Sequence, residues 1–186
     1  MGKVKFGFKN CYYAPITVGT DGAITYGTPV KLDGAVSMSL SASGDKTEFY
    51  ADDSLYFSDE NNNGYEGDLE LALIPDDFAI ACLGQTKDTN NVVAENATNA
   101  TSPFALLCEF TTDNGATKFV FYNCNATRPA INGTTKGENK EVQTETLNLT
   151  IRPRPDGLVK NKTTADTPTA TVEGWYSAVY TGTASN

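Results

Sequence analysis

The chain has no histidine and few sulfur-containing or tryptophan side chains: two methionines, four cysteines and one tryptophan among 186 residues. Histidine is the usual proton carrier near neutral pH. Its absence excludes Ser-His-Asp and Cys-His catalysis and most zinc and non-haem iron centres. None of the cysteines shows the C-x₂-C spacing of a zinc site; they are Cys11, Cys82, Cys108 and Cys124. We therefore expect no enzyme activity, no cofactor and no metal centre.

Long apolar runs are also missing. The basic start at residues 1–6 is not followed by the run of about 7–15 apolar residues that a signal peptide needs. No segment approaches the roughly 18 apolar residues of a membrane span. We expect a protein without a membrane anchor, made in a cytoplasm, whose thiols stay reduced and pack as small apolar groups. Six N-x-[ST] sequences are interpreted as chance in a chain rich in Asn and Thr; they start at Asn96, Asn99, Asn125, Asn132, Asn148 and Asn161.

Positive charge is scarce. There are 14 Lys and Arg against 23 Asp and Glu, a formal net charge of -9. Such a chain repels a phosphate backbone unless its basic residues cluster, and along the sequence they do not. This excludes a nucleic-acid-binding surface of the usual kind. The length and the 39% hydrophobic content predict one globular domain over residues 1–186.

Alternation of apolar and polar residues, bounded by turn residues, dominates the pattern and predicts β-strands. We expect strands at residues 36–40 and 47–51 as well as three hairpins. The first hairpin joins residues 15–18 to 23–26. The second joins 55–58 to 65–73 across Asn63-Gly64, and the third joins 104–110 to 118–122 across Asn114-Gly115. Asn-Gly favours hairpin turns because both residues tolerate positive φ.

One helix interrupts the strands. Residues 75–83 carry a proline and two acids at the start, apolar residues at i, i+4, and Gly84 as the terminating residue. We expect a loop at 84–102 with a short edge strand near Val92 and Val93. A long strand follows at 141–151, and a last strand at 172–180 includes Trp175. The predicted fold is all-β: a β-sandwich or partial barrel of roughly ten mostly antiparallel strands with one short flanking helix.

An acidic stretch is the strongest candidate for metal or acid–base chemistry. The spacing from Asp59 to Glu70 matches the calcium-loop pattern D-x-[DN]-x-[DN]-G-x₅-E. That loop normally lies between two helices, whereas here the flanking segments alternate like strands. We therefore favour a solvated hairpin tip over a calcium site, and a calcium site over a pair of catalytic carboxylates.

Several predicted strands have one polar face. Asp68 and Glu70 alternate with Leu69, Leu71 and Leu73, and similar small or polar faces occur at 37–41 and 144–150. Such a face suits the outside of a sandwich, and it also suits the inner wall of a water-filled β-channel. The residues alone do not separate these readings.

Four stretches together resemble the major tail protein family of long-tailed phages (siphophages) of Gram-positive hosts. The central ones are ADDSLYFS at residues 51–58 and NNNGYEGDLELALIPDDFA at 61–79, closed by Leu83-Gly84. KNCYYAP at 9–15 and LNLTIRPRPDG at 147–157 are similar too. The hairpin at 104–122 and the aromatic segment after Glu173 also fit, so the likeness spans most of the chain.

The resemblance implies a single tail-tube-type domain that forms stacked hexameric rings, a tail tube that conducts double-stranded DNA to the host without binding it specifically. It also implies tape-measure, tail-terminator and distal tail proteins as partners, and a location in the virion tail after assembly in the host cytoplasm. Asp68 and Glu70 are then candidate lumen-facing acids. The long hairpin at 44–66 is a candidate assembly arm, with a tip at Asp59, Glu60, Asn61, Asn62, Asn63 and Gly64.

Two other classes stay open. One is the tube-forming subunit of a related bacterial injection system, which has the same architecture. The other is a carbohydrate-binding sandwich, which needs exposed aromatic platforms. We expect the aromatic residues Tyr12, Tyr13, Tyr50, Tyr56 and Trp175 to lie in the core or between strands instead.

Overall fold

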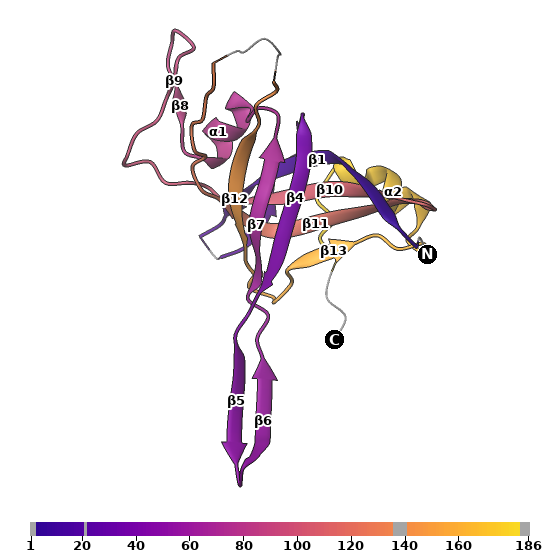
Figure 1. Cartoon of the computed structure of the whole chain (residues 1–186). Coiled ribbons are helices and arrows are strands. Elements are labelled where there is room, and N and C mark those ends of the chain that lie inside the picture. The colour runs from indigo at the N-terminus through magenta and orange to yellow at the C-terminus, as the bar shows by residue number, and fades with distance from the viewer. Residues whose placement is uncertain (1–2, 21, 136–140, 183–186) are drawn as a thin grey trace.

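The computed structural model describes residues 3–20, 22–135 and 141–182. Its regular structure is mostly antiparallel β-strand, and most of the strands form one curled sheet (Figure 1). The main sheet has nine strands, with the order β2-β1-β10-β11-β12-β7-β4; β13 pairs with β11 and β3 with β1. Its strands are β1 (Lys5–Val18), β2 (Ile24–Tyr26), β3 (Val30–Leu32), β4 (Ala35–Ser43), β7 (Gly64–Leu71), β10 (Phe104–Thr112), β11 (Gly115–Ala126), β12 (Glu145–Ile151) and β13 (Lys160–Lys162). The expected all-β class is confirmed.

Two separate pairs of strands complete the β-structure. They are β5 (Lys46–Ala51) with β6 (Ser54–Glu60), and β8 (Thr86–Lys87) with β9 (Val93–Ala94). The helical elements are α1 (Asp76–Cys82), α2 (Thr169–Glu173) and the 3₁₀ turn η1 (Gly174–Tyr176). The described residues thus form thirteen strands and two helices, where roughly ten strands and one helix were expected, mainly because short pairings in loops are invisible to periodicity.

Two predicted hairpins are confirmed. β1 and β2 pair from Ile16 with Tyr26 to Val18 with Ile24. β10 and β11 pair down to Thr112 with Gly115, so Asp113 and Asn114 form the turn. The expected strand at 141–151 is shorter than predicted, since β12 begins at Glu145.

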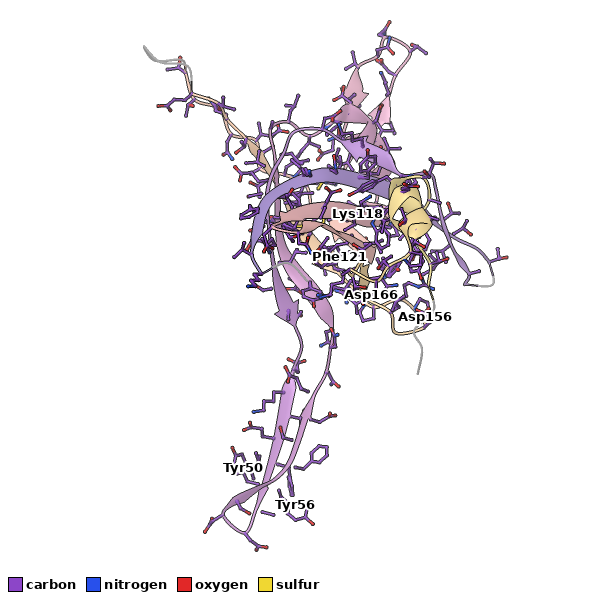
Figure 2. All side chains as sticks on the ribbon, turned by 90° about the vertical axis from the view of Figure 1, so that its right-hand side faces the viewer. Tyr50, Tyr56, Lys118, Phe121, Asp156 and Asp166 are labelled. Atoms are coloured by element: carbon purple, nitrogen blue, oxygen red, sulfur yellow. The ribbon has the colours of Figure 1, made fainter. Side chains whose placement is uncertain are left out.

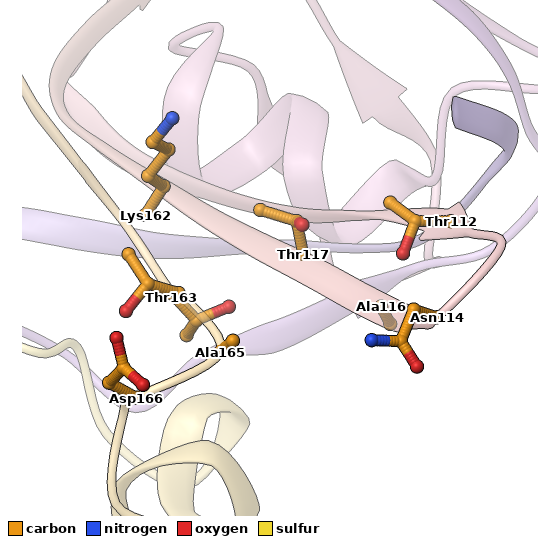
Figure 3. A pocket seen from close by; sticks show the side chains of 9 residues that line it. Thr112, Asn114, Ala116, Thr117, Lys162, Thr163, Ala165 and Asp166 are labelled. Atoms are coloured by element: carbon orange, nitrogen blue, oxygen red, sulfur yellow. The ribbon is translucent and has the colours of Figure 1, made fainter. Parts of the chain in front are cut away.

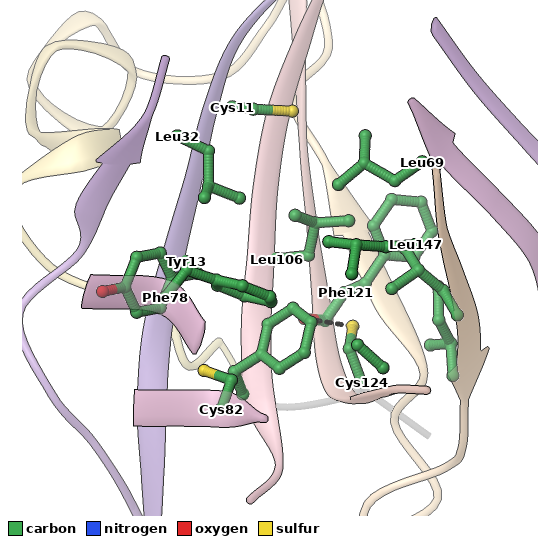
Figure 4. Close-up of a cluster of buried hydrophobic side chains, with 14 of the residues drawn as sticks. Cys11, Tyr13, Leu32, Leu69, Phe78, Cys82, Leu106, Phe121, Cys124 and Leu147 are labelled. Carbon is green, nitrogen blue, oxygen red and sulfur yellow. Dashed lines mark hydrogen bonds between the residues drawn. The ribbon is translucent and has the colours of Figure 1, made fainter. Parts of the chain in front are cut away.

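Two apolar clusters lie on the two faces of the β1-β10-β11 part of the sheet. The inner cluster fills the space between this part and β12-β7, and it includes all four cysteines (Figure 4). Helix α1 closes one end of it through Phe78, which meets Tyr13 edge-on with ring centroids 5.0 Å apart. The helix ends where predicted, at Gly84 with φ +75°. The cysteines are unpaired and buried, as expected for small apolar groups.

The outer cluster is covered by the C-terminal segment, and here the prediction of a strand at 172–180 is wrong. The segment forms α2 and η1 instead, starting after Pro168. Trp175 and Val179 are buried together against Ala14, Leu107 and Val120. Trp175 lies in η1 and Val179 in the irregular segment after it, so the alternation of apolar residues here does not reflect a strand. In the part of the chain that the structure describes, no helix has the length and apolar character to cross a membrane.

Candidate assembly surfaces

The most exposed element is a two-stranded arm, residues 46–60, made of β5 and β6 (Figure 1). It extends away from the sheet as a continuation of β4 and β7. The strands pair from Lys46 with Glu60 to Ala51 with Ser54, so Asp52 and Asp53 form the turn. Both turn residues have positive φ, 51° and 54°, as a two-residue hairpin turn of the primed type requires. An arm in the 44–66 region is thus present, as predicted.

The predicted tip lies elsewhere. Asp59 and Glu60 belong to β6 near the base of the arm, and Asn61–Asn63 connect the arm to β7 rather than forming a hairpin turn. Two backbone hydrogen bonds cross this joint, from Asn61 N to Asp45 O (3.1 Å) and from Asn63 N to Ser43 O (2.9 Å). The prediction failed because Asn61–Asn63 carry the chain from β6 into β7, which begins at Gly64 with φ +102°, whereas two aspartates make the turn.

The arm carries five large apolar side chains that no other described part of the chain covers. Phe49 is 58% exposed, Tyr50 61%, Leu55 50%, Tyr56 75% and Phe57 54%. Tyr50 and Tyr56 lie on opposite sides of the arm near its tip (Figure 2). Both tyrosines lie in the paired strands β5 and β6 but not in the core, whereas Tyr13 and Trp175 are buried and Tyr12 is half-buried. A two-stranded hairpin has no second layer in which to bury its apolar residues.

The arm is also acidic. It contains five carboxylates and one lysine, a net charge of -4 (1 minus 5). Lys46 pairs with Glu48, which also accepts a hydrogen bond of 2.9 Å from the Tyr50 hydroxyl. These two contacts, the lysine first, lower the pKa of Glu48. The arm therefore combines apolar side chains with a negative potential, a combination that restricts which surfaces it can contact.

A second surface is the polar face of β4, β7 and β12. The register places Ser39 and Asn148 on either side of Asp68, and Ser37 and Thr146 on either side of Glu70. Asn148 Nδ2 donates to Asp68 Oδ1. The neighbouring leucines Leu69 and Leu71 are fully buried on the other face. The predicted alternation is confirmed from Asp68 to Leu71, and both candidate lumen acids share one solvent-facing surface. The prediction that Leu73 also faces the core is wrong, because β7 ends at Leu71 and Leu73 is 68% exposed.

Glu70 is held by hydroxyl groups from both neighbouring segments. The Thr144 hydroxyl donates to Oε1 at 2.6 Å and the Ser37 hydroxyl donates to Oε2 at 2.8 Å. These hydrogen bonds, that of Thr144 first, lower the pKa of Glu70 because they stabilise the charged carboxylate. The polar face therefore keeps this negative charge well below neutral pH.

The calcium-loop pattern is not folded as a loop. Asp59, the first residue of the pattern, lies in β6 of the arm, while Glu70 lies near the end of β7 and accepts hydrogen bonds from Ser37 and Thr144. Among the described residues, no group of three or more His, Cys, Asp or Glu side chains is arranged to hold a metal ion. The hairpin tip favoured for residues 59–64 is wrong, because the turn lies at Asp52 and Asp53, whereas Glu70 does lie on the polar face of a strand.

The sheet also has an unpaired edge. Within the described ranges, β4 pairs only with β7, and β4 is nine residues long. An edge strand can offer backbone donors and acceptors to a further strand, although part of β4 lies close to β1. Val36 on this strand is 47% exposed.

The comparisons with known proteins identify no relative. No model of a known protein family matches the chain, and no curated protein matches its sequence.

Proposed function

We propose that this chain is a structural subunit that assembles with further copies of itself into a hollow tube of the phage tail tube type. The observation that supports this most is the arm, with five large apolar side chains in water. A two-stranded hairpin is at best marginally stable alone. Contiguous exposed apolar surface of this kind marks a contact surface, and a self-assembling subunit supplies a contact for every arm.

Two further features support a tube. The free edge of β4 is suited to pairing with a strand of a neighbouring copy, and closing a ring of sheets removes such edges. The polar face with Asp68 and Glu70 is suited to line a wet channel. Its negative charge would repel DNA phosphates, so that DNA passes through without being held. The motif resemblance to the major tail proteins points the same way.

The test compares assembly of the wild-type chain with that of an arm variant. Size-exclusion chromatography with light scattering and negative-stain microscopy of concentrated protein should show rings or tubes. The triple substitution Phe49→Ser, Tyr56→Ser and Phe57→Ser should give a folded monomer. The matched control, Ile131→Ser with Val142→Ser, changes side chains that are 100% and 86% exposed and should still assemble. A wild-type chain that stays monomeric at every concentration would refute the proposal.

A tube of a bacterial injection system would give the same images. Tape-measure and tail-terminator genes beside this gene separate the two, because the phage tail requires them.

A carbohydrate-binding role is the second candidate, favoured by the exposure of Tyr50 and Tyr56. Because these two side chains lie on opposite sides of a narrow arm, they do not form one aromatic surface for a sugar ring. Calorimetric titration with oligosaccharides would reveal such binding in a chain that does not assemble.

A further inference from the structure

Five aromatic rings form a continuous row on the inner face of the sheet. Neighbouring ring centroids are 5.3, 5.6, 6.2 and 6.1 Å apart, in the order Phe8, Phe110, Phe119, Phe121 and Tyr65. Phe121 is buried, but the other four rings are half-buried. We call these five residues the aromatic row. It extends the inner cluster to the surface at the end of the sheet away from α1.

Three lysines border the aromatic row. Lys5 Nζ lies 4.3 Å from the centroid of Phe110, and Lys160 Nζ lies 4.4 Å from that of Tyr65. Lys162 is paired in register with Phe119 and is therefore on the same face. Across the described parts of the chain, none of these three ammonium groups has a carboxylate within 4 Å. The chain has a net charge of -9, and these lysines concentrate unpaired positive charge over half-buried rings.

A pocket adjoins the row at Lys162. Its volume is about 360 Å³, and it lies between the β10–β11 turn region and residues 162–166. Thr117, which is paired with Phe110, connects the pocket to the row. Asp166 is the one acid among the lining residues, and the Lys162 ammonium points away from it (Figure 3). The pocket is at the low end of the size of small-molecule sites, which is ample for one aromatic side chain.

The arm and the aromatic row are complementary in both charge and apolar character. The arm has a net charge of -4 and exposes five large apolar side chains, while the row exposes rings between three unpaired lysines. The arm points away from β10, β11 and β13 of its own chain (Figure 1), so contact requires a second copy. Opposite charges across an interface also fix which surfaces meet.

We infer that the acceptor for the arm is the aromatic row of a neighbouring copy, with Lys5, Lys160 and Lys162 facing the arm carboxylates and an arm aromatic side chain entering the pocket beside Lys162. This inference rests on the proposed self-assembly and identifies the surface of the neighbouring copy that receives the arm. Burying the arm rings against the row removes both apolar surfaces from water. Lysine stems over the rings add cation–π and charge contacts.

The direct test is a photo-crosslink. Tyr56 is replaced by the photoreactive amino acid p-benzoylphenylalanine, assembled protein is irradiated, and crosslinked peptides are identified by mass spectrometry. The expected partners are peptides of β10, β11 or β13 and residues 162–166 of another copy. The same substitution at Ile131, which is fully exposed outside the arm, is the control and should not give these crosslinks.

Charge reversal gives a second, independent readout. Lys160→Glu with Lys162→Glu should raise the concentration at which half the protein is assembled by at least about tenfold, because like charges would face each other. Lys3→Glu with Lys87→Glu is the matched control and should leave that concentration unchanged. Circular dichroism establishes that each variant is folded, and the crosslink does not depend on the lysine variant folding.

The outcomes separate the two ideas. Crosslinks to the row together with weakened assembly of the lysine variant support the inference. Assembled wild-type protein whose crosslinks map to another surface overturns the inference and leaves self-assembly standing. A lysine variant that assembles normally but has lost binding to a short DNA duplex would also overturn it, as the row would then be a phosphate site. A wild-type monomer overturns self-assembly itself.

Discussion

The hydroxyl of Tyr176 donates a hydrogen bond of 3.1 Å to Oε2 of Glu109, a carboxylate that is buried at the middle of the sheet. Glu109 also receives Asn10 Nδ2 at 3.3 Å and Lys9 Nζ at 3.4 Å. Burial, followed by this neighbouring carboxylate, raises the pKa of Tyr176, so that the hydroxyl stays a donor. The ring of Tyr176 stacks on Tyr12 with centroids 4.5 Å apart. The C-terminal segment is therefore fixed to the outer face by a polar contact as well as by Trp175.

Tyr176→Phe should destabilise the fold by about 2 kcal/mol, since it removes a hydrogen bond to a buried carboxylate while keeping the ring. Urea unfolding followed by the fluorescence of Trp175, the single tryptophan, measures this. Tyr180→Phe is the control, because Tyr180 is 42% exposed and its ring contact to Trp175 remains. Equal stability of both variants would mean that the Glu109 contact is not important in solution.

Gly64→Ala should lower the free energy of unfolding by about 3 kcal/mol or more. The residue has φ +102°, and a Cβ there would lie 1.9 Å from the carbonyl oxygen of Ile151. The control is Gly133→Ala, where an added Cβ meets nothing within 4 Å. Denaturant unfolding compares the two variants. A Gly64→Ala protein as stable as the control would contradict the placement of β7 against residue 151.

Glu70 should contribute stability that depends on pH. Because its pKa in the folded chain is lowered by Thr144 and Ser37, its contribution is present above the pKa of an unfolded glutamate. It is lost as the pH falls through the lowered value. The melting temperatures of wild type and Glu70→Gln should therefore differ at pH 7 and converge in strong acid. Thr144→Val should reduce the difference at pH 7, and a difference that grows on acidification would show the opposite sign.

The cysteines should resist thiol reagents until the protein unfolds. Burial raises the pKa of Cys11 and Cys82 to about 12. At pH 8 their thiolate fraction is then about a thousandfold lower than that of a thiol with the ordinary value of 9.0. Labelling with a chromogenic disulfide should give four fast thiols in denaturant and none in native protein. Fast reaction of the native chain would show that the inner cluster opens readily.

Local sequence rules predicted the fold class because strands such as β4, β7 and β12 have one more buried and one wetter face. Leu69 and Leu71 against Asp68 and Glu70 is the clearest example, and the helix ending at Gly84 follows from terminal residues alone. The C-terminal segment was mispredicted because its apolar residues alternate as in a strand, whereas a short helix, a 3₁₀ turn and the irregular residues after them bury Trp175 and Val179. Periodicity alone does not show that this segment covers the outer face of the sheet instead of joining the sheet as a strand.

The candidate arm was harder to predict in detail. The sequence indicates the length of the arm but not the position of its turn. The turn lies at Asp52 and Asp53 rather than at Asn63-Gly64, and the pairing of β5 with β6 next to it holds both aspartates at positive φ. Exposure of Tyr50 and Tyr56 depends on the absence of any covering layer, which is a property of the tertiary arrangement. The aromatic row joins five residues from β1, β7, β10 and β11, so no local segment reveals it.

The acids of the arm act in a further way while copies are still separate. Phe49, Tyr50, Leu55, Tyr56 and Phe57 form a short, strongly β-forming apolar segment of the kind that drives uncontrolled aggregation. Asp52 and Asp53 at the turn and Asp59 and Glu60 at the base bracket them as gatekeepers, so two identical arms repel each other. The same four carboxylates thus keep separate copies soluble and restrict which surfaces the arm can bind. Neutralising them would cause precipitation in place of ordered assembly.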